Sequence, residues 1–117
     1  MDQRRFDRVP AGFGLESECR SDQMPANTWS SIAVVDLSAG GLRFHSRESL
    51  GLGELIDVRI RLPNLAKPLA LRARVVRRGS PGPGGRECAA EYLDVTPDQR
   101  AEIDELVQFL RTRPPSP

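Results

Sequence analysis

The sequence predicts a mainly β protein in which six short strands form a barrel or sandwich and one α-helix follows at the C-terminal end. Apolar and polar residues alternate with a period of two through most of the first 93 positions, as they do in half-buried strands. Turn residues interrupt these runs at intervals typical of all-β domains. After residue 95 the apolar residues recur at helical spacing instead.

The alternation predicts the strands in chain order. The run 55–62 is the clearest, because four branched apolar residues share one face while Asp57, Arg59 and Arg61 share the other. Between the last two strands, residues 80–85 hold two prolines and three glycines, which predicts a flexible hairpin loop without regular structure. The predicted strands cover residues 11–20, 28–36, 42–45, 55–62, 69–78 and 86–93.

The helix is predicted over residues 96–113. Thr96 suits the capping position, Pro97 the first helical position, and Gln99 the reciprocal position of a capping box. The apolar stripe consists of Ile103, Leu106, Val107 and Leu110. We expect this stripe to cover one open end of a barrel, although the pattern leaves open a homodimer contact instead.

Composition predicts one domain with its own core. The chain has 117 residues with a formal net charge of +1, which argues against a general binder of nucleic acid polymers. No apolar run is long enough to span a membrane, and the first residues do not resemble a signal peptide, so we expect a cytoplasmic protein without membrane insertion. Cys19 and Cys88 fall in strand-like runs and are predicted to be buried thiols; a single histidine, His45, makes a metal site improbable.

The chain divides into an arm over residues 1–10, a barrel over 11–95, the helix, and a tail over 114–117. Arg4, Arg5 and Arg8 precede any periodic pattern, so the arm is predicted to be flexible and basic. The simplest interpretation is a solvated terminus. Against this interpretation, every basic residue in the arm is an arginine, and the planar guanidinium of arginine fits phosphate oxygens or a guanine edge.

A polar corner lies between the second and third predicted strands. Asp36 and Ser38 are two residues apart and share a face on an extended chain, while Gly40 and Gly41 allow positive φ and close approach of a ligand. Together they could grip a small polar molecule. Alternatively, Asp36 and Ser38 only close the turn through their own hydrogen bonds.

The arm and the corner together resemble the PilZ domain family. Arg4 and Arg8 form Arg-x-x-x-Arg, and 28 positions later Asp36, Ser38 and Gly41 form Asp-x-Ser-x-x-Gly. The resemblance extends over about residues 3–111 and implies a six-stranded antiparallel β-barrel of the split-barrel type with a C-terminal helix.

The resemblance also implies a function: binding of the bacterial second messenger cyclic di-GMP. The arm, Arg4 and Arg8 with Arg5 beside them, would fold over the ligand, and the corner from Asp36 to Gly41 would form the floor. The chemistry agrees, since an arginine fork fits guanine O6 and N7 and a carboxylate fits the guanine N1–H and N2–H₂ donors. Ser38 and the Gly40 backbone complete the expected site.

We therefore expect a non-enzymatic cyclic di-GMP receptor or adaptor that needs no cofactor. Because the chain carries no attached output domain, a downstream protein partner or self-association should provide the output. The alternative is a PilZ-like interaction module that binds no nucleotide.

An RNA-binding barrel is disfavoured because aromatic residues are few, and Trp29 is predicted to lie in the core rather than to stack bases. Scattered carboxylates without a catalytic triad disfavour an enzyme. The sequence leaves open whether Arg77 or Arg78, late in their strand, contacts the ligand.

Overall fold

The computed structural model describes residues 9–10, 15–25, 28–61 and 67–112. All of its strand pairings are antiparallel, as the alternating pattern predicts. The elements are β1 (Val9–Pro10), β2 (Glu16–Ser21), β3 (Ser30–Leu37), β4 (Gly41–Ser46), β5 (Leu55–Arg61), β6 (Leu69–Gly82), β7 (Gly85–Leu93) and α1 (Pro97–Thr112).

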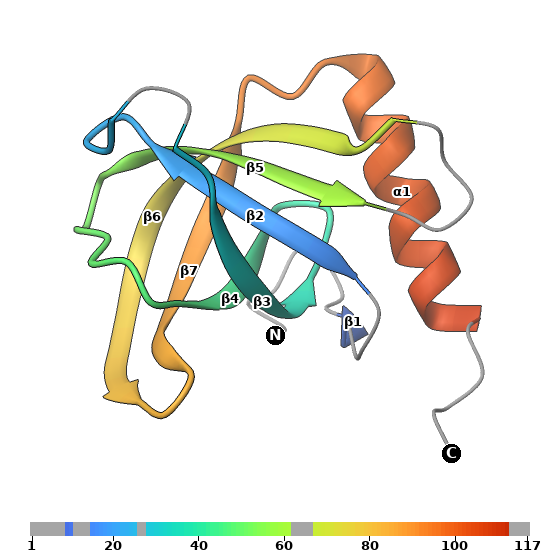
Figure 1. Cartoon of the computed structure of the whole chain (residues 1–117). Helices are drawn as coiled ribbons and strands as arrows, with labels where there is room; N and C mark the ends of the chain where they lie inside the picture. Colours follow the sequence, from blue (N-terminus) through green and yellow to red (C-terminus); the bar gives the residue numbers. More distant parts are fainter. Residues whose placement is uncertain (1–8, 11–14, 26–27, 62–66, 113–117) are drawn as a thin grey trace, which may run out of the picture.

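Six of these strands form a closed antiparallel barrel (Figure 1). The strands neighbour one another in the order β3, β2, β5, β6, β7 and β4, and a further pairing between β3 and β4 closes the ring. The short strand β1 adds to β3. The predicted six-stranded barrel with a C-terminal helix is thus confirmed, and the sandwich that the strand pattern also allowed is not formed.

The core fills the inside of the barrel with side chains from alternate positions of each strand. Both cysteines lie there as free thiols, as predicted, and burial raises the pKa of the Cys19 thiol to about 12. The largest completely enclosed side chains are Phe44, Leu37, Leu42, Leu50, Ile56, Ile60, Leu69, Ile103 and Leu106. Two of them come from α1, so the helix and the barrel share one core.

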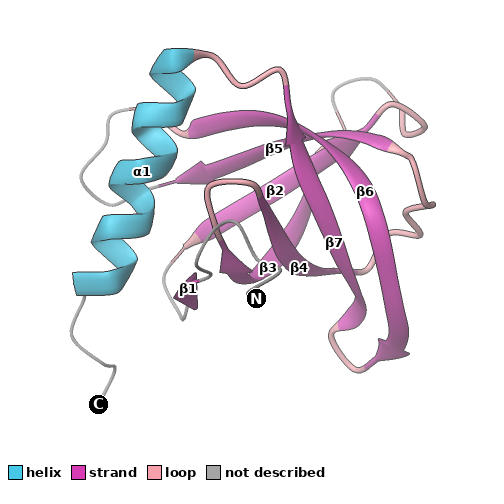
Figure 2. Cartoon of the chain, turned by 180° about the vertical axis from the view of Figure 1, so that it is seen from behind, coloured by secondary structure: helices cyan, strands magenta, loops and turns pink. Residues whose placement is uncertain are grey.

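The helix packs against β6 and β1, where Figure 2 shows it alongside one end of the barrel. Its predicted apolar stripe is buried. The capping box is formed in both directions: the Thr96 backbone N–H donates to Gln99 Oε1 over 2.9 Å, and the Gln99 N–H donates to Thr96 Oγ1 over 3.1 Å. The Gln99 side chain also donates to the Ala70 carbonyl over 3.0 Å, which ties the helix start to β6. In the part of the chain that the structure describes, no helix has the length and apolar character needed to cross a membrane.

The prediction of a loop without regular structure over residues 80–85 is wrong. β6 continues to Gly82 and β7 begins at Gly85, so only two residues connect them. A register shift between Arg78 and Pro81 lets the proline, which has no N–H for the ladder, lie within the hairpin. Gly85 completes the tight turn with a φ of +105°, where a side chain would be strained. Proline and glycine therefore mark a bulge and a turn in this hairpin rather than a break in it.

The prediction that Trp29 lies in the core is also wrong. The indole is half-buried and outside the core, just before β3. The Arg59 guanidinium lies 3.6 Å from the ring centroid and the Arg20 guanidinium 4.8 Å from it. Cation–π contact replaces core packing here because β2 and β5 both present arginine on this outer face.

Candidate functional site

The corner between β3 and β4 is a tight hairpin turn held by Ser38. The Ser38 N–H donates to the Gly41 carbonyl over 2.9 Å, and the Ser38 hydroxyl donates to the same carbonyl over 3.4 Å. That hydroxyl accepts from the Gly40 N–H over 3.2 Å. Ser38 is buried. For Ser38, then, the turn-closing interpretation describes the geometry.

Asp36 holds a different position. Its carboxylate is buried, and Oδ2 accepts a hydrogen bond from Arg43 Nε over 2.8 Å and a second one from Arg43 Nη2. Asp36 and Arg43 are direct cross-strand partners on β3 and β4. This charge-assisted contact provides what a buried carboxylate requires, and it fixes the direction in which the carboxylate points.

Arg43 also links the corner to β7. Its Nη1 lies 3.4 Å from Glu87 Oε1, and the other oxygen of Glu87 lies 3.5 Å from His45 Nε2. The hydrogen bond to Asp36 is the main cause that raises the pKa of Arg43 above its ordinary value. The sequence analysis did not single out Arg43 as a site residue. The signal that could have found it is the hairpin register, because a turn over residues 38–41 makes residues 36 and 43 neighbours.

The glycines of the corner matter for the close packing of neighbouring strands rather than for an unusual backbone conformation. Among the described glycines, positive φ occurs at Gly53 and Gly85, so neither Gly40 nor Gly41 uses the positive φ that glycine allows. A Cβ at Gly41 would stand 2.3 Å from the Ala90 carbonyl oxygen, because β7 pairs with β4 at this position. The glycine at position 41 thus permits close strand packing.

The end of the arm lies beside the corner. Val9 pairs with Leu37 and Pro10 pairs with Asp36. Arg8 immediately precedes Val9 in the sequence. Arg4, Arg5 and Arg8 themselves lie outside the described residues.

The helix contacts the corner from another side. Arg100 Nη1 donates to the Ala39 carbonyl over 2.6 Å. The next carbonyl, that of Gly40, accepts from the Tyr92 N–H of β7 over 3.1 Å. The backbone of the three-residue turn is therefore held by contacts from β7 and α1, while β1 pairs with the two strand residues that precede the turn.

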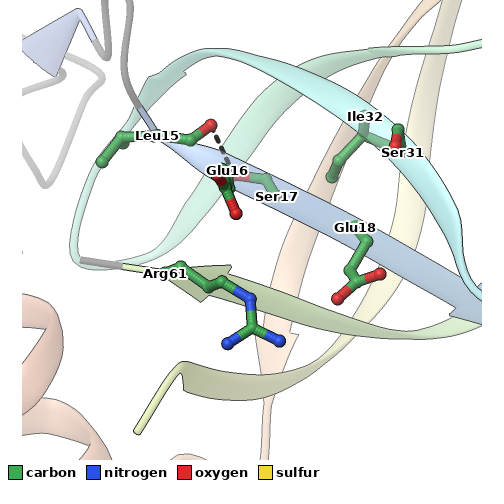
Figure 3. A pocket seen from close by; sticks show the side chains of 7 residues that line it. All are labelled: Leu15, Glu16, Ser17, Glu18, Ser31, Ile32 and Arg61. Atoms are coloured by element: carbon green, nitrogen blue, oxygen red, sulfur yellow. Dashed lines mark hydrogen bonds between the residues drawn. The ribbon is translucent and has the colours of Figure 1, made fainter. Parts of the chain in front are cut away.

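Two hollows open on other parts of the surface. One of about 290 Å³ lies over β2, β3 and β5, where Arg61 faces Glu16 and Glu18 (Figure 3). Another of about 360 Å³ lies beside Trp29 and Arg72. Neither is lined by a residue of the corner. Within the described part of the chain, no group of three or more histidines, cysteines or carboxylates has an arrangement that could hold a metal ion.

Comparison with known families identifies the class of protein that has this fold and corner. The family model for the PilZ domain matches residues 2–109. The chain therefore belongs to the PilZ family, and the resemblance carried by the two motifs is confirmed. A search of curated proteins found no match.

Solved structures agree on the fold. The PilZ domain of YcgR from Escherichia coli with c-di-GMP has a TM-score of 0.71 and 16% identity, and the match covers 94% of this chain and 92% of that one. The MrkH–c-di-GMP complex of K. pneumonia has a TM-score of 0.74 and 13% identity over 95% of this chain and 53% of that one. The Bacillus subtilis inhibitor of motility (MotI/DgrA) has a TM-score of 0.69 and 22% identity over 97% and 55%. The chain thus spans about half the length of the last two proteins.

Proposed function

We propose that this chain is a cyclic di-GMP receptor module that changes its surface when the dinucleotide binds and signals through a partner protein. Two of the similar structures hold this ligand, YcgR and MrkH. The chain has both motifs of the family resemblance intact, Arg-x-x-x-Arg and Asp-x-Ser-x-x-Gly. The proposal includes no cofactor and no catalysis, and it assumes a bacterial, cytoplasmic protein.

The single observation that supports this proposal best is the pairing of β1 with β3. The two motifs are 28 positions apart in the sequence, yet Val9 and Pro10 lie directly beside Leu37 and Asp36. The last arginine of the arm is therefore the residue before β1, the strand that pairs with the aspartate-bearing β3. We therefore expect a ligand on the corner to be within reach of both motifs, as the family resemblance implies.

Each group then has a role that its chemistry suits. The arm arginines, Arg4 and Arg8 with Arg5 beside them, bind guanine edges and phosphates over the ligand. Asp36 accepts from the Watson–Crick donors of one guanine, with Arg43 fixing the carboxylate. Ser38, Gly40 and Gly41 shape the floor, because the serine hydroxyl is engaged in the turn.

The output follows from where the arm is attached. β1 packs against α1, and α1 reaches the corner through Arg100. An arm that closes over the ligand would change the surface beside β1 and α1, which is where we expect a partner protein, or a second copy of the chain, to bind.

Titration calorimetry with cyclic di-GMP tests the proposal. We expect saturable binding by the parent chain, a loss of at least tenfold in affinity for Arg4→Ala and Arg8→Ala, and little change for the control Arg61→Ala. Arg61 is an exposed arginine on β5 and lines the hollow away from the corner. A folded parent that gives no heat at high micromolar concentration would contradict the proposal.

A second candidate is a PilZ module that contacts proteins without binding nucleotide. It is favoured by one observation: Ser38 and Asp36 both take part in contacts that hold the hairpin, so the motif has structural value without a ligand. Thermal unfolding separates the two, because a ligand selective for the native state must raise the melting temperature. An unchanged melting temperature at saturating cyclic di-GMP would favour the second candidate.

A further inference from the structure

Four residues form a row across the outer face of four neighbouring strands, beginning at the corner. Asp36 on β3 is opposite Arg43 on β4, Arg43 is opposite Ala89 on β7, and Ala89 is opposite Arg77 on β6. Directly opposite residues in antiparallel strands present their side chains on the same face. The row therefore leads from the proposed ligand floor to Arg77.

A β-bulge brings Arg77 to this face. In β6 the buried residues Leu71, Ala73 and Val75 alternate with outward ones, and an unbroken alternation would turn residue 77 inward. The register with β7 shifts between Val75 and Arg77, so that Arg77 becomes the partner of Ala89 and is exposed. Bulges of this kind can re-aim a side chain, and they are over-represented at the rims of barrels and next to active sites.

The described arginines in and beside this row differ in their charge partners. Arg43 contacts Asp36 and Glu87, and Arg74 forms an ion pair with Glu91. Among the described residues, no carboxylate lies within ion-pair distance of Arg77. The residue between the two arginines is Ala89, whose short side chain is buried.

We propose that Arg77 binds a phosphate group of the cyclic dinucleotide, as a second subsite beyond the corner. This inference rests on the proposed function and adds a residue outside both family motifs. Arg43 and Arg77 are two strand spacings apart, about 10 Å, a span that a two-nucleotide ligand can cover. The neighbouring Arg78 does not take part, since it is opposite Cys88, whose side chain is buried in the barrel.

The neighbouring arginines provide a matched pair of variants. Affinity for cyclic di-GMP is measured by calorimetry for the parent, Arg77→Gln, Arg77→Lys and Arg78→Gln, with melting temperatures as a check of folding. We expect a loss of about tenfold for Arg77→Gln, which corresponds to one charge-assisted hydrogen bond on an exposed face. Arg77→Lys should keep most of the affinity, because an ammonium still binds phosphate as a point charge. Arg78→Gln should change affinity less than twofold.

Each result has one meaning. Equal losses for Arg77→Gln and Arg78→Gln would indicate general attraction between charges and would overturn the subsite, and unchanged affinity for Arg77→Gln would overturn it as well. In both cases the proposed function would stand, since the parent binds. A folded parent that binds no cyclic di-GMP would overturn the proposed function and the subsite together.

Discussion

The Arg43 guanidinium donates from Nε and Nη2 to the same oxygen of the Asp36 carboxylate, across the hairpin between β3 and β4. The carboxylate is buried while the arginine is partly exposed. An aspartate proposed to bind a guanine is thus already oriented by a neighbour that sequence reasoning did not assign to it. The contact between Asp36 and Arg43 therefore contributes to the free energy of unfolding, and this contribution can be measured without any ligand.

Removal of either partner should therefore destabilise the protein. For Arg43→Gln we expect the free energy of unfolding to fall by about 1–2 kcal/mol, since one charged partner of a buried carboxylate is lost but solvent screens part of the effect. Urea unfolding measures this. In a double-mutant cycle with Asp36→Asn, the two losses should not add, and additive losses would mean that the contact contributes nothing.

Gly41→Ala should be destabilising whether or not ligand binds. The new methyl group would stand 2.3 Å from the Ala90 carbonyl oxygen, so β4 and β7 must separate, at about 1–3 kcal/mol. Gly82→Ala is the control, because its Cβ would find only an ordinary contact of 3.7 Å with the Gly85 carbonyl oxygen. Thermal or urea unfolding compares the two, and equal stabilities would show that the strands near residue 41 give way easily.

The capping box predicts a measurable contribution to the helix. Thr96→Ala removes the acceptor for the Gln99 N–H, and we expect a loss of about 1 kcal/mol in the free energy of unfolding. Thr112→Ala serves as the control at the other end of the helix, where the hydroxyl donates back to the carbonyls of Gln108 and Phe109 within the same helix. A larger loss at Thr112 than at Thr96 would contradict this account of the helix start.

Stability should fall at alkaline pH because of Cys19. Burial raises the thiol's pKa in the folded chain from 9.0 to about 12. Between these values the unfolded chain releases a proton that the folded chain keeps, so the free energy of unfolding decreases as pH rises above 9. Urea unfolding at pH 8 and at pH 10 gives the decrease in the free energy of unfolding between these two pH values. We expect this decrease to be about 1 kcal/mol smaller in Cys19→Ala than in the parent. Identical pH dependence in the two chains would mean that Cys19 is not enclosed.

The sequence was sufficient for the architecture because alternation, turns and caps are local signals. The run around Val58 and the capping pair Thr96 and Gln99 each specify their element without knowledge of the rest of the chain. The same local reasoning failed where a local signal has two outcomes. Pro81 and Gly85 indicate a break in a strand, but they equally permit a bulge and a tight turn within a hairpin.

The site could be predicted only in its motif residues. Asp36, Ser38 and Gly41 stand out by spacing, whereas the contacts that place them depend on strand register and on distant segments. Arg43 becomes a partner of Asp36 only once the hairpin register is known, and Arg100 reaches the Ala39 carbonyl only because the helix packs beside the corner. Such long-range neighbours leave no periodic trace in a single sequence.

The position of Trp29 makes intrinsic tryptophan fluorescence a probe of how far a structural change spreads through the barrel. It is the single tryptophan, it is in contact with two guanidinium groups, and it precedes β3, whereas the corner follows the far end of that strand, roughly 25 Å away. The fluorescence emission of Trp29 should therefore stay unchanged when a ligand contacts only the corner and the arm. A change in intrinsic fluorescence on adding a dinucleotide would instead reveal that the whole wall of the barrel between β2 and β5 responds.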